Sequence, residues 1–350
     1  MFEKSTWIKL PRTVLVGHDV VDDLGTAVGE LYLSGRPLIV TSPTPESIAG
    51  DRVRAQFDDP ETAVVESASF DAVESLKETA EAVDPGYLIA LGGGKPIDIA
   101  KMAADHLGVG FVSVPTVASH DGIVSGRSSI PEGDTRHSVA ADPPLAVVAD
   151  TSLLAEAPWR LTTAGCADII SNYTAVKDWR LAHRLRNVEY SEYAGALSEM
   201  TAELLVENAD LIRPGVEESS WVVVKALVSS GVAMSIAGSS RPASGAEHLI
   251  SHQLDRIAPG KALHGHQVGV AAIVTEYLHS GEHGEWAAIR DALAELGAPT
   301  TAGDLGIADD ELIAALTTAH EIRDRYTILQ GGITEAAAME VATATGVVER

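Results

Sequence analysis

Three consecutive glycines at positions 92–94 stand between an apolar run and a run with helical spacing, and this junction constrains the fold more than any other feature of the chain. Residues 87–91 have the length and composition of a buried strand, and residues 96–107 have the spacing of an amphipathic helix. Pro96 suits a first helical turn, because the N–H that proline lacks would be unpaired there, and Asp98 lies where the helix dipole favours an acid. The junction therefore predicts a strand, a tight turn and a helix.

Glycines at such a turn let a pyrophosphate approach the free N–H groups at the helix N-terminus. The same residues can also make a plain tight connection, and the glycine run alone does not separate the two interpretations. Its place after a strand and before a helix with these start signals favours phosphate binding. Neither GxGxxG after the first strand nor GxxxxGK[ST] occurs, so the usual dinucleotide fingerprint and the P-loop are both absent.

The first 150 residues repeat this alternation of short β-branched runs and amphipathic runs, which is typical of parallel strands joined by crossover helices. The predicted strands are residues 13–16, 38–41, 63–66, 87–91 and 110–114, and the predicted helices are residues 20–32, 45–57, 71–82 and 96–107. Residues 122–150 predict a hairpin and a returning strand. From Thr151 onward, segments with helical spacing predominate.

A chain of 350 residues exceeds the size at which one core usually stops growing, so two domains are expected. We predict an α/β fold. Residues 1–150 should form an open, Rossmann-like parallel-sheet domain that binds NAD(P). Residues 151–350 should form an all-helical domain that binds metal and substrate.

The pattern GGGxxxDxxK, matched by the glycine run, Asp98 and Lys101, resembles the superfamily of iron-type alcohol dehydrogenases, glycerol dehydrogenases and dehydroquinate synthases. A second segment, SVPTVASHDGIVSGRSS, is similar to that superfamily's other cofactor loop, although its hydroxyls and glycines also suit an ordinary turn. The resemblance implies a dehydroquinate synthase-like fold, NAD(H) or NADP(H) as cofactor, and Asp121 facing the substrate. The residues implied to contact the dinucleotide are Gly92, Gly93, Gly94, Lys95, Pro96, Ile97, Asp98, Thr116, Val117, Ala118, Ser119 and Ser125.

Asp168 and four histidines, His248, His252, His264 and His266, lie in otherwise apolar stretches of the helical half. A helix would place His248 and His252 on one face. A carboxylate with two imidazoles suits Zn²⁺ with an open coordination position and suits Fe²⁺ equally, although each histidine taken singly is more often structural. The resemblance implies that Asp168, His248 and His264 hold one metal ion, Zn²⁺ or alternatively Fe²⁺ or Ni²⁺. His266 is the alternative to His264, because many relatives have Glu after HG.

The resemblance also implies that the metal polarises a ketone oxygen while the reduced nicotinamide delivers a hydride. Asp121, Asp168 and His252 would bind substrate or take part in catalysis. His252 would orient the substrate or relay a proton, or else it is a packing histidine.

The string SSRPASGAEHLISHQLD at residues 239–255 and the shorter string ASHDG resemble the sn-glycerol-1-phosphate dehydrogenase branch. That branch reversibly reduces dihydroxyacetone phosphate to sn-glycerol 1-phosphate, the backbone of archaeal ether lipids. Glycerol dehydrogenase, dehydroquinate synthase and a non-enzymatic binding protein are the alternatives. Arg241 is a candidate partner for a substrate phosphate, and a helix-capping or surface role is the other interpretation.

Cofactor preference is expected to be relaxed. NAD-specific sites commonly place a carboxylate after the second strand, where it would repel a 2′-phosphate. Here that segment reads VTSPTPES and offers the hydroxyls of Ser42 and Thr44, so we predict that both NADH and NADPH are accepted. Glu46 is the residue that would supply the carboxylate instead.

Acidic residues number 50 against 25 Lys and Arg, a formal net charge of −25 that repels nucleic acid. With Lys scarce, this favours a halophilic protein kept soluble in concentrated salt, where the Debye length falls to about 3 Å, over an ordinary acidic enzyme. The single cysteine, Cys166, is expected to be a buried thiol. With no uncharged apolar run of about 18 residues and no signal-peptide core, we expect a cytoplasmic homo-oligomer without a membrane span, whose partner is a small-molecule substrate.

Overall fold

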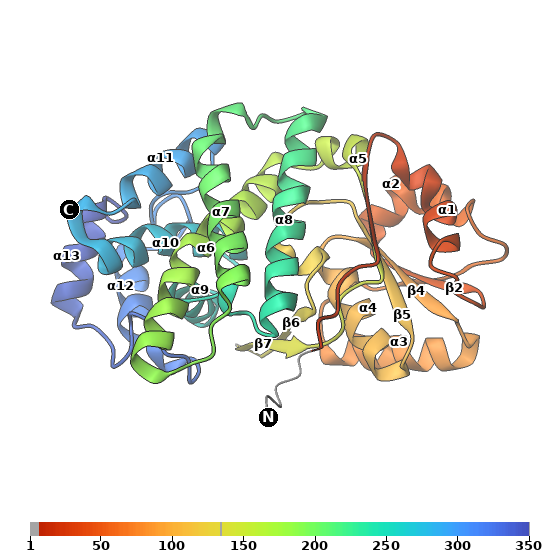
Figure 1. Ribbon diagram of the computed structural model, residues 1–350, viewed down its shortest axis with the longest axis horizontal. Helices are drawn as coiled ribbons and strands as arrows, with labels where there is room; N and C mark the ends of the chain where they lie inside the picture. Colours follow the sequence, from red (N-terminus) through yellow and green to blue (C-terminus); the bar gives the residue numbers. More distant parts are fainter. Residues whose placement is uncertain (1–6, 134, 350) are drawn as a thin grey trace, which may run out of the picture.

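The computed structural model describes residues 7–133 and 135–349. Residues 1–6, to which the expected absence of a signal-peptide core partly refers, and Asp134 of the predicted hairpin turn lie outside this range. Figure 1 shows a sheet with its helices at one end of an elongated molecule and a group of longer helices at the other. In the described residues every strand lies before Thr151, and all later elements are helices.

A six-stranded parallel sheet has the order β1-β8-β5-β4-β2-β3. The predicted α/β fold class with a parallel sheet is confirmed, and each predicted strand is present. The third strand lies two residues earlier than predicted. The strands are β1 (Thr13–Gly17), β2 (Pro37–Thr41), β3 (Glu61–Val64), β4 (Tyr87–Gly92), β5 (Gly110–Pro115) and β8 (Ala146–Asp150).

Helices cover both faces of the sheet, because successive side chains of a strand point to opposite faces. On one face, Leu38 and Leu88 belong to the core that α3 and α4 join. On the other face, Ile39 and Ile89 pack with α1 and α2. These helices are α1 (Leu24–Gly29), α2 (Pro43–Arg54), α3 (Phe70–Val83) and α4 (Gly94–Leu107), with a short 3₁₀ turn η1 (Val20–Asp23) replacing the start of the helix predicted at residues 20–32.

Helix α4 begins at Gly94, two residues before the predicted start, so Asp98 is its fifth residue and lies beyond the first turn. The expectation that Asp98 complements the helix dipole is therefore wrong. Its carboxylate instead accepts a hydrogen bond from the Ser129 N–H at 3.2 Å. The buried Lys101 donates to the carbonyls of Gly122 at 2.8 Å and Arg127 at 2.5 Å. Both side chains tie the helix after the glycine turn to the segments that follow β5.

The predicted hairpin is a separate two-stranded sheet of β6 (Arg127–Glu132) and β7 (Thr135–Ala140), and β8 is the returning strand. The hairpin packs against α9 of the helical half. The helices after β8 are α5 (Thr151–Glu156), α6 (Trp159–Arg186), α7 (Glu192–Glu207), α8 (Glu217–Ala237), α9 (Ala246–Ile257), α10 (His264–Ser280), α11 (Trp286–Leu296), α12 (Asp309–Thr318) and α13 (Glu335–Thr345), with 3₁₀ turns η2 (Asp121–Ile123), η3 (Ala209–Leu211), η4 (Arg241–Ala243), η5 (Gly281–His283) and η6 (Ala319–Glu321).

Among the described residues, only α8 is long and apolar enough to cross a membrane by length and composition. Lys225 interrupts its apolar run, so the helix contains no uncharged apolar run of about 18 residues. Half of its apolar window is buried inside the protein, where it packs against α5, α6 and α7. This burial is that of a core helix.

Candidate active site

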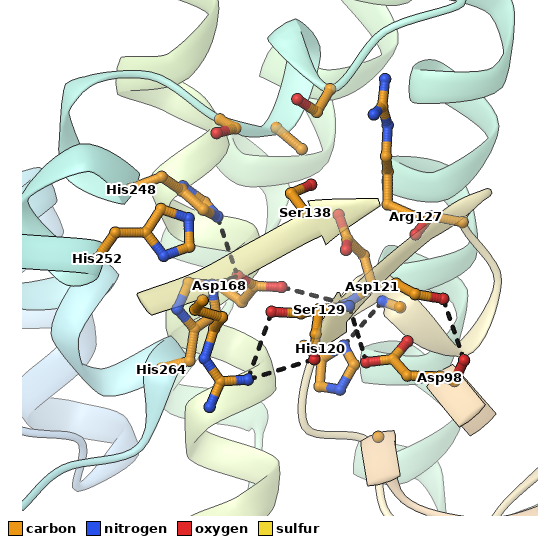
Figure 2. Close-up of a pocket in the computed structure, with 18 of the residues that line it drawn as sticks. Asp98, His120, Asp121, Arg127, Ser129, Ser138, Asp168, His248, His252 and His264 are labelled. Carbon is orange, nitrogen blue, oxygen red and sulfur yellow. Dashed lines mark hydrogen bonds and ion pairs between the residues drawn. The ribbon is translucent and has the colours of Figure 1, made fainter. Parts of the chain in front are cut away.

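A cavity of about 320 Å³ lies where the glycine turn, η2 and the β6–β7 hairpin meet the helical half (Figure 2). Its lining includes the acids and three of the histidines singled out in the sequence: Asp121, Asp168, His248, His252 and His264. These residues come from η2, α6, α9 and α10, so the fold gathers side chains that are up to 143 positions apart, 121 to 264. The volume suits a small ligand.

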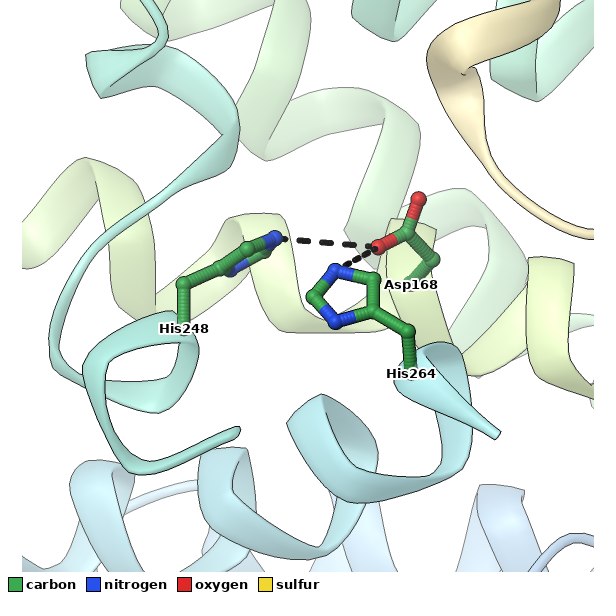
Figure 3. Close-up of side chains that lie close together, drawn as sticks. All are labelled: Asp168, His248 and His264. Atoms are coloured by element: carbon green, nitrogen blue, oxygen red, sulfur yellow. Dashed lines mark ion pairs between the residues drawn. The ribbon is translucent and has the colours of Figure 1, made fainter. Parts of the chain in front are cut away.

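Asp168, His248 and His264 converge on one point (Figure 3). One ligand-type atom from each lies within 4.8 Å of the others. The Asp168 Oδ1 is 3.8 Å from His248 Nε2 and 3.9 Å from His264 Nε2. Asp168 and these two imidazoles therefore have the arrangement of a divalent-metal site with room for a further ligand.

The other ring nitrogen of each histidine is held by a neighbouring side chain. His248 Nδ1 is 2.9 Å from Glu247 Oε1, and His264 Nδ1 is 2.9 Å from Ser251 Oγ. Ser251 in turn donates to Gln267 Oε1 at 2.7 Å. Such partners fix the ring orientation and keep Nε2 available for a metal. Glu247 and Ser251 are site residues that the sequence analysis did not find, although Glu247 directly precedes His248.

The charge balance at this point also favours a bound cation. Burial and the nearby carboxylate of Asp121 raise the pKa of Asp168 well above its ordinary value. Burial raises the pKa of Asp121 as well, against the opposing effects of His120 and Ser230. A divalent cation would stabilise both carboxylates in their charged form.

Two further predicted residues flank the cluster. The Asp121 carboxylate accepts a hydrogen bond from Ser230 at 3.0 Å, and its backbone N–H donates to Asp168 Oδ2 at 3.1 Å. His252 stacks on His264 with ring centroids 5.8 Å apart, and its buried Nδ1 has no hydrogen-bond partner in the described part of the chain. Burial, followed by the charge of Arg323, lowers the pKa of His252 well below its ordinary value, so this imidazole is neutral.

His266, the alternative ligand, lies apart from the cluster. Its Nε2 is 2.9 Å from Thr163 Oγ1, and burial lowers its pKa to about 4. It does not belong to the group of side chains that meet at Asp168. The structure therefore favours His264 over His266 as the third member.

The two segments expected to bind the dinucleotide lie side by side, because the Thr116 N–H donates to the Gly92 carbonyl at 3.1 Å. Gly94, Lys95, Asp98 and Ser125 line the cavity. Elsewhere in the predicted set, the side chains of Val117 and Ser119 are half-buried. Fully buried side chains are those of Pro96, Ile97, Thr116 and Ala118. Those residues can offer a ligand little more than their backbone.

Cavity-lining residues that the sequence analysis missed include His120, whose Nδ1 accepts a hydrogen bond from the Gly122 N–H at 2.9 Å. Arg127, Arg136 and Arg323 also line the cavity. Arg127 lies in the segment similar to the second cofactor loop but was not singled out there. No local pattern marks Arg136 or Arg323, which come from the other hairpin strand and from a loop near the C-terminus. The predicted Arg241 is half-buried, and its guanidinium contacts the Tyr326 carbonyl at 3.4 Å. Cys166 is buried, as expected.

Sequence comparison with known proteins matches this chain to dehydrogenases of one family. The family model described as iron-containing alcohol dehydrogenase matches residues 15–158. A glycerol-1-phosphate dehydrogenase [NAD(P)+] of Halorubrum lacusprofundi is 89% identical over 349 residues, covering 100% of both chains. Enzymes with the same name are 75% identical in Haloquadratum walsbyi, over 99% of this chain and 100% of the relative, and 52% identical in Methanosarcina mazei, over 98% and 97%.

Solved structures with a similar fold are more distant. A probable glycerol dehydrogenase from Sinorhizobium meliloti superposes with a TM-score of 0.79 at 22% identity, covering 97% of this chain and 98% of that one. A glycerol dehydrogenase from Schizosaccharomyces pombe gives 0.78 at 20% identity, covering 99% and 95%. At these identities the likeness supports the fold alone.

Proposed function

The chain belongs to the glycerol-1-phosphate dehydrogenase family within the iron-containing alcohol dehydrogenases, and from that premise we propose that it reversibly reduces dihydroxyacetone phosphate to sn-glycerol 1-phosphate with NADH or NADPH. The observation that carries the proposal is the full-length 89% identity to an enzyme of that name. The product would supply the glycerol backbone of ether lipids.

We further propose that Asp168, His248 and His264 hold one Zn²⁺ ion, with Fe²⁺ or Ni²⁺ as alternatives. Two imidazoles and a carboxylate match the donor preferences of these metals, and the held Nδ1 atoms of both histidines support the assignment. A divalent metal bound here would polarise a ketone oxygen as a Lewis acid.

The side chains around this point would orient the substrate. Asp121, fixed by Ser230, offers its carboxylate to a substrate hydroxyl. His252 is neutral, and its Nδ1 has no partner among the described residues, so its ring can donate or accept a hydrogen bond at the same substrate. Reduction of a ketone by hydride also consumes one proton, which His252 would relay to the substrate. The predicted cofactor residues, which run from Gly92 to Asp98 and from Thr116 to Ser119 and include Ser125, would hold the dinucleotide beside them.

A cytoplasmic location and a homo-oligomeric state also stay proposals. Large apolar side chains exposed on α7 and α8, including Met200, Leu204 and Trp221, support self-association. Sedimentation of the purified protein in molar KCl would give its oligomeric state.

Turnover of phosphorylated and free dihydroxyacetone in molar KCl tests the function. We expect dihydroxyacetone phosphate to have a kcat/KM about 10⁴-fold higher, because a site that pairs buried donors with a phosphate leaves them unsatisfied when the phosphate is missing. Chiral analysis should give sn-glycerol 1-phosphate, and the sn-3 product would contradict the proposal. Equal turnover of free dihydroxyacetone would favour glycerol dehydrogenase. Net consumption of NADH excludes dehydroquinate synthase chemistry, in which the cofactor is recycled.

A further inference from the structure

Four arginines gather around the loop of residues 240–244: Arg127 from β6, Arg241 from η4, and Arg323 and Arg325 from the segment after η6. Arg323 Nη2 donates to Ser244 Oγ at 2.9 Å. Arg325 Nη2 donates to Ser240 Oγ at 2.8 Å, and its Nη1 donates to the Ser244 carbonyl. Serine hydroxyls and guanidinium groups thus meet at one place, which we call the arginine cluster.

In the described residues, no carboxylate lies within 4.0 Å of any of these four guanidinium groups, although the chain has 50 acids for 25 Lys and Arg. Other arginines, such as Arg52 and Arg180, make close ion pairs. The acid whose charge bears on Arg323 and Arg325 is Glu247, and it is already bonded to His248 and Thr174. Asp178 and Asp324 act in the same way on Arg241. Among the described residues, the cluster therefore carries positive charge that no carboxylate pairs with directly.

This unpaired charge is costly in a folded protein. Burial, reinforced by Arg127 and Arg241, lowers the pKa of Arg323 to about 10, which still leaves it charged at neutral pH. Burial and the adjacent Arg323 and Arg241 also lower the pKa of Arg325 well below its ordinary value. The Nε of Arg323 is buried and has no hydrogen-bond partner in the described part of the protein. A bound anion would satisfy that donor and offset the repulsion.

The cluster opens into the same cavity as Asp168, His248 and His264, because Arg127, Arg323, Ser240 and Ser244 all line it. In Figure 2, Arg127 extends from its strand away from Asp98, and His248 and His252 lie across the cavity from it. A ligand held at the Asp168 cluster by one end can thus reach the arginines with its other end.

We propose that the arginine cluster is the subsite for the phosphate of the three-carbon substrate, with Arg323, Arg127 and the two serine hydroxyls in direct contact. Guanidinium forks match phosphate oxygens in geometry as well as charge. Arg325 and Arg241 do not line the cavity, so they act as positioning residues that hold the serine loop. The inference rests on the proposed function, because it assigns the part of the site that would select a phosphorylated ketone.

The test compares the holoenzyme with Arg323→Gln and Arg127→Gln. For each variant we expect kcat/KM for dihydroxyacetone phosphate to fall about a hundredfold, mostly through KM, because a half-buried charged partner of the phosphate is lost. Turnover of free dihydroxyacetone and the KM for NADH should stay within about twofold of wild type. Arg323→Lys, which keeps the charge and loses the fork, should recover part of the loss. Arg213→Gln is the matched control, because Arg213 is exposed and pairs with Glu295.

Inorganic phosphate provides a readout without turnover. It should raise the Tm of the wild-type holoenzyme and compete with dihydroxyacetone phosphate, and both effects should be lost in Arg323→Gln. Equal losses for both ketones, or an unchanged kcat/KM in both variants, would overturn the inference. A rise confined to the KM for NADH would also overturn it, by assigning the cluster to the dinucleotide phosphates. If the wild type does not reduce dihydroxyacetone phosphate but phosphate still binds through Arg323, the proposed function fails and the anion site stands.

Discussion

His248 and His264 each use one ring nitrogen to contact a neighbouring side chain, which leaves the other directed toward Asp168. His266 has the opposite situation, because its Nε2 is taken by Thr163. The sequence identified this set only through a family resemblance and left His264 and His266 as alternatives. Neither spacing nor residue type shows which way an imidazole points, and only the packing of α6 against α10 decides it.

Loss of a ligand should remove metal and activity together. We predict that Asp168→Asn, His248→Ala and His264→Ala each lose bound metal and at least about a hundredfold in kcat, since the remaining donors leave the site incomplete. His266→Ala is the matched control and should keep its metal. Metal content after dialysis, measured beside turnover, checks this. Full occupancy in all three variants would refute the assignment, and loss of metal in His266→Ala alone would shift it to that residue.

Helices α6 and α10 approach each other backbone to backbone where they present Asp168 and His264. A Cβ added at Gly265 would lie 2.0 Å from the Ala164 carbonyl oxygen, and one added at Gly165 would lie 2.0 Å from the Ala118 carbonyl oxygen. The second contact places the loop before Asp121 against α6. Glycine is therefore required at both positions by close approach rather than by a positive φ.

A side chain added at this close approach of α6 and α10 should lower the stability of the protein and disturb the metal site. We predict that Gly265→Ala lowers the free energy of unfolding by about 2–4 kcal/mol and weakens metal retention, because α10 must move away from α6. Gly29→Ala is the control: it lies in helix α1 with nothing within 4 Å of the added Cβ, so it should be neutral or stabilising. Thermal unfolding and metal content measure both effects. Equal Tm values for the two variants would contradict the close contact.

The junction of β2 and α2 bears on cofactor choice. Ser42 is the N-cap of α2, and Thr44 is exposed in the first turn. Glu46, which the sequence left as a possible 2′-hydroxyl partner, forms an ion pair with Arg54 on the same helix. Its Oε1 is engaged along α2, while its buried Oε2 has no hydrogen-bond partner in the described part of the chain. Ser42 is buried, so the exposed Thr44 hydroxyl is the group that the junction offers to a ligand.

Both nicotinamide cofactors should therefore be accepted. We predict kcat/KM values for NADH and NADPH that differ by less than about a hundredfold, or about 2.7 kcal/mol. Initial rates with each cofactor at saturating ketone give the ratio. A stronger preference for NADH would show that a carboxylate does face the 2′-hydroxyl, and Glu46→Gln would then be expected to relax it.

At the scale of elements, the sheet and its crossover helices could be predicted because buried parallel strands read as continuous apolar runs of fixed length. The beginning of α4 could not be predicted, since glycine is compatible with either a turn or a helix, and Gly94 is the first residue of the helix. Only part of the arginine cluster could be predicted. Arg241 was a candidate phosphate partner, and Arg127 lies in the segment similar to the second cofactor loop without being singled out. Arg323 stands 196 positions from Arg127, 323 − 127, and in no recognisable motif.

The whole molecule carries a formal net charge of −25, and most of its acids face solvent, as Glu30, Asp51 and Glu78 do. Like charges on a compact surface repel one another and oppose folding, and dissolved salt screens this repulsion. The relatives from Halorubrum and Haloquadratum come from organisms whose names denote salt habitats, which fits a protein of this charge.

Stability should therefore depend on salt concentration. We predict that Tm rises as KCl increases, most steeply below about 0.5 M, where the Debye length shortens fastest. NaCl should act equally at the same ionic strength, because screening does not depend on which monovalent cation supplies it. Calorimetry at fixed pH, across a salt series, checks the curve. A flat Tm would mean that surface repulsion contributes little to the free energy of unfolding.

The acids that face outward and the acids that serve the cavity are separate sets of residues, and this separation has a practical consequence for anyone redesigning the protein. Replacing outward acids such as Glu30, Asp51 or Glu78 by Lys or Gln would adapt the enzyme to dilute buffer, while Asp168 and Glu247, buried among helices, keep their surroundings. Stability in concentrated salt and catalytic activity thus depend on different residues of the same chain. Substitutions in one set of acids can therefore change the salt requirement without changing the active site, and substitutions in the other set can do the reverse.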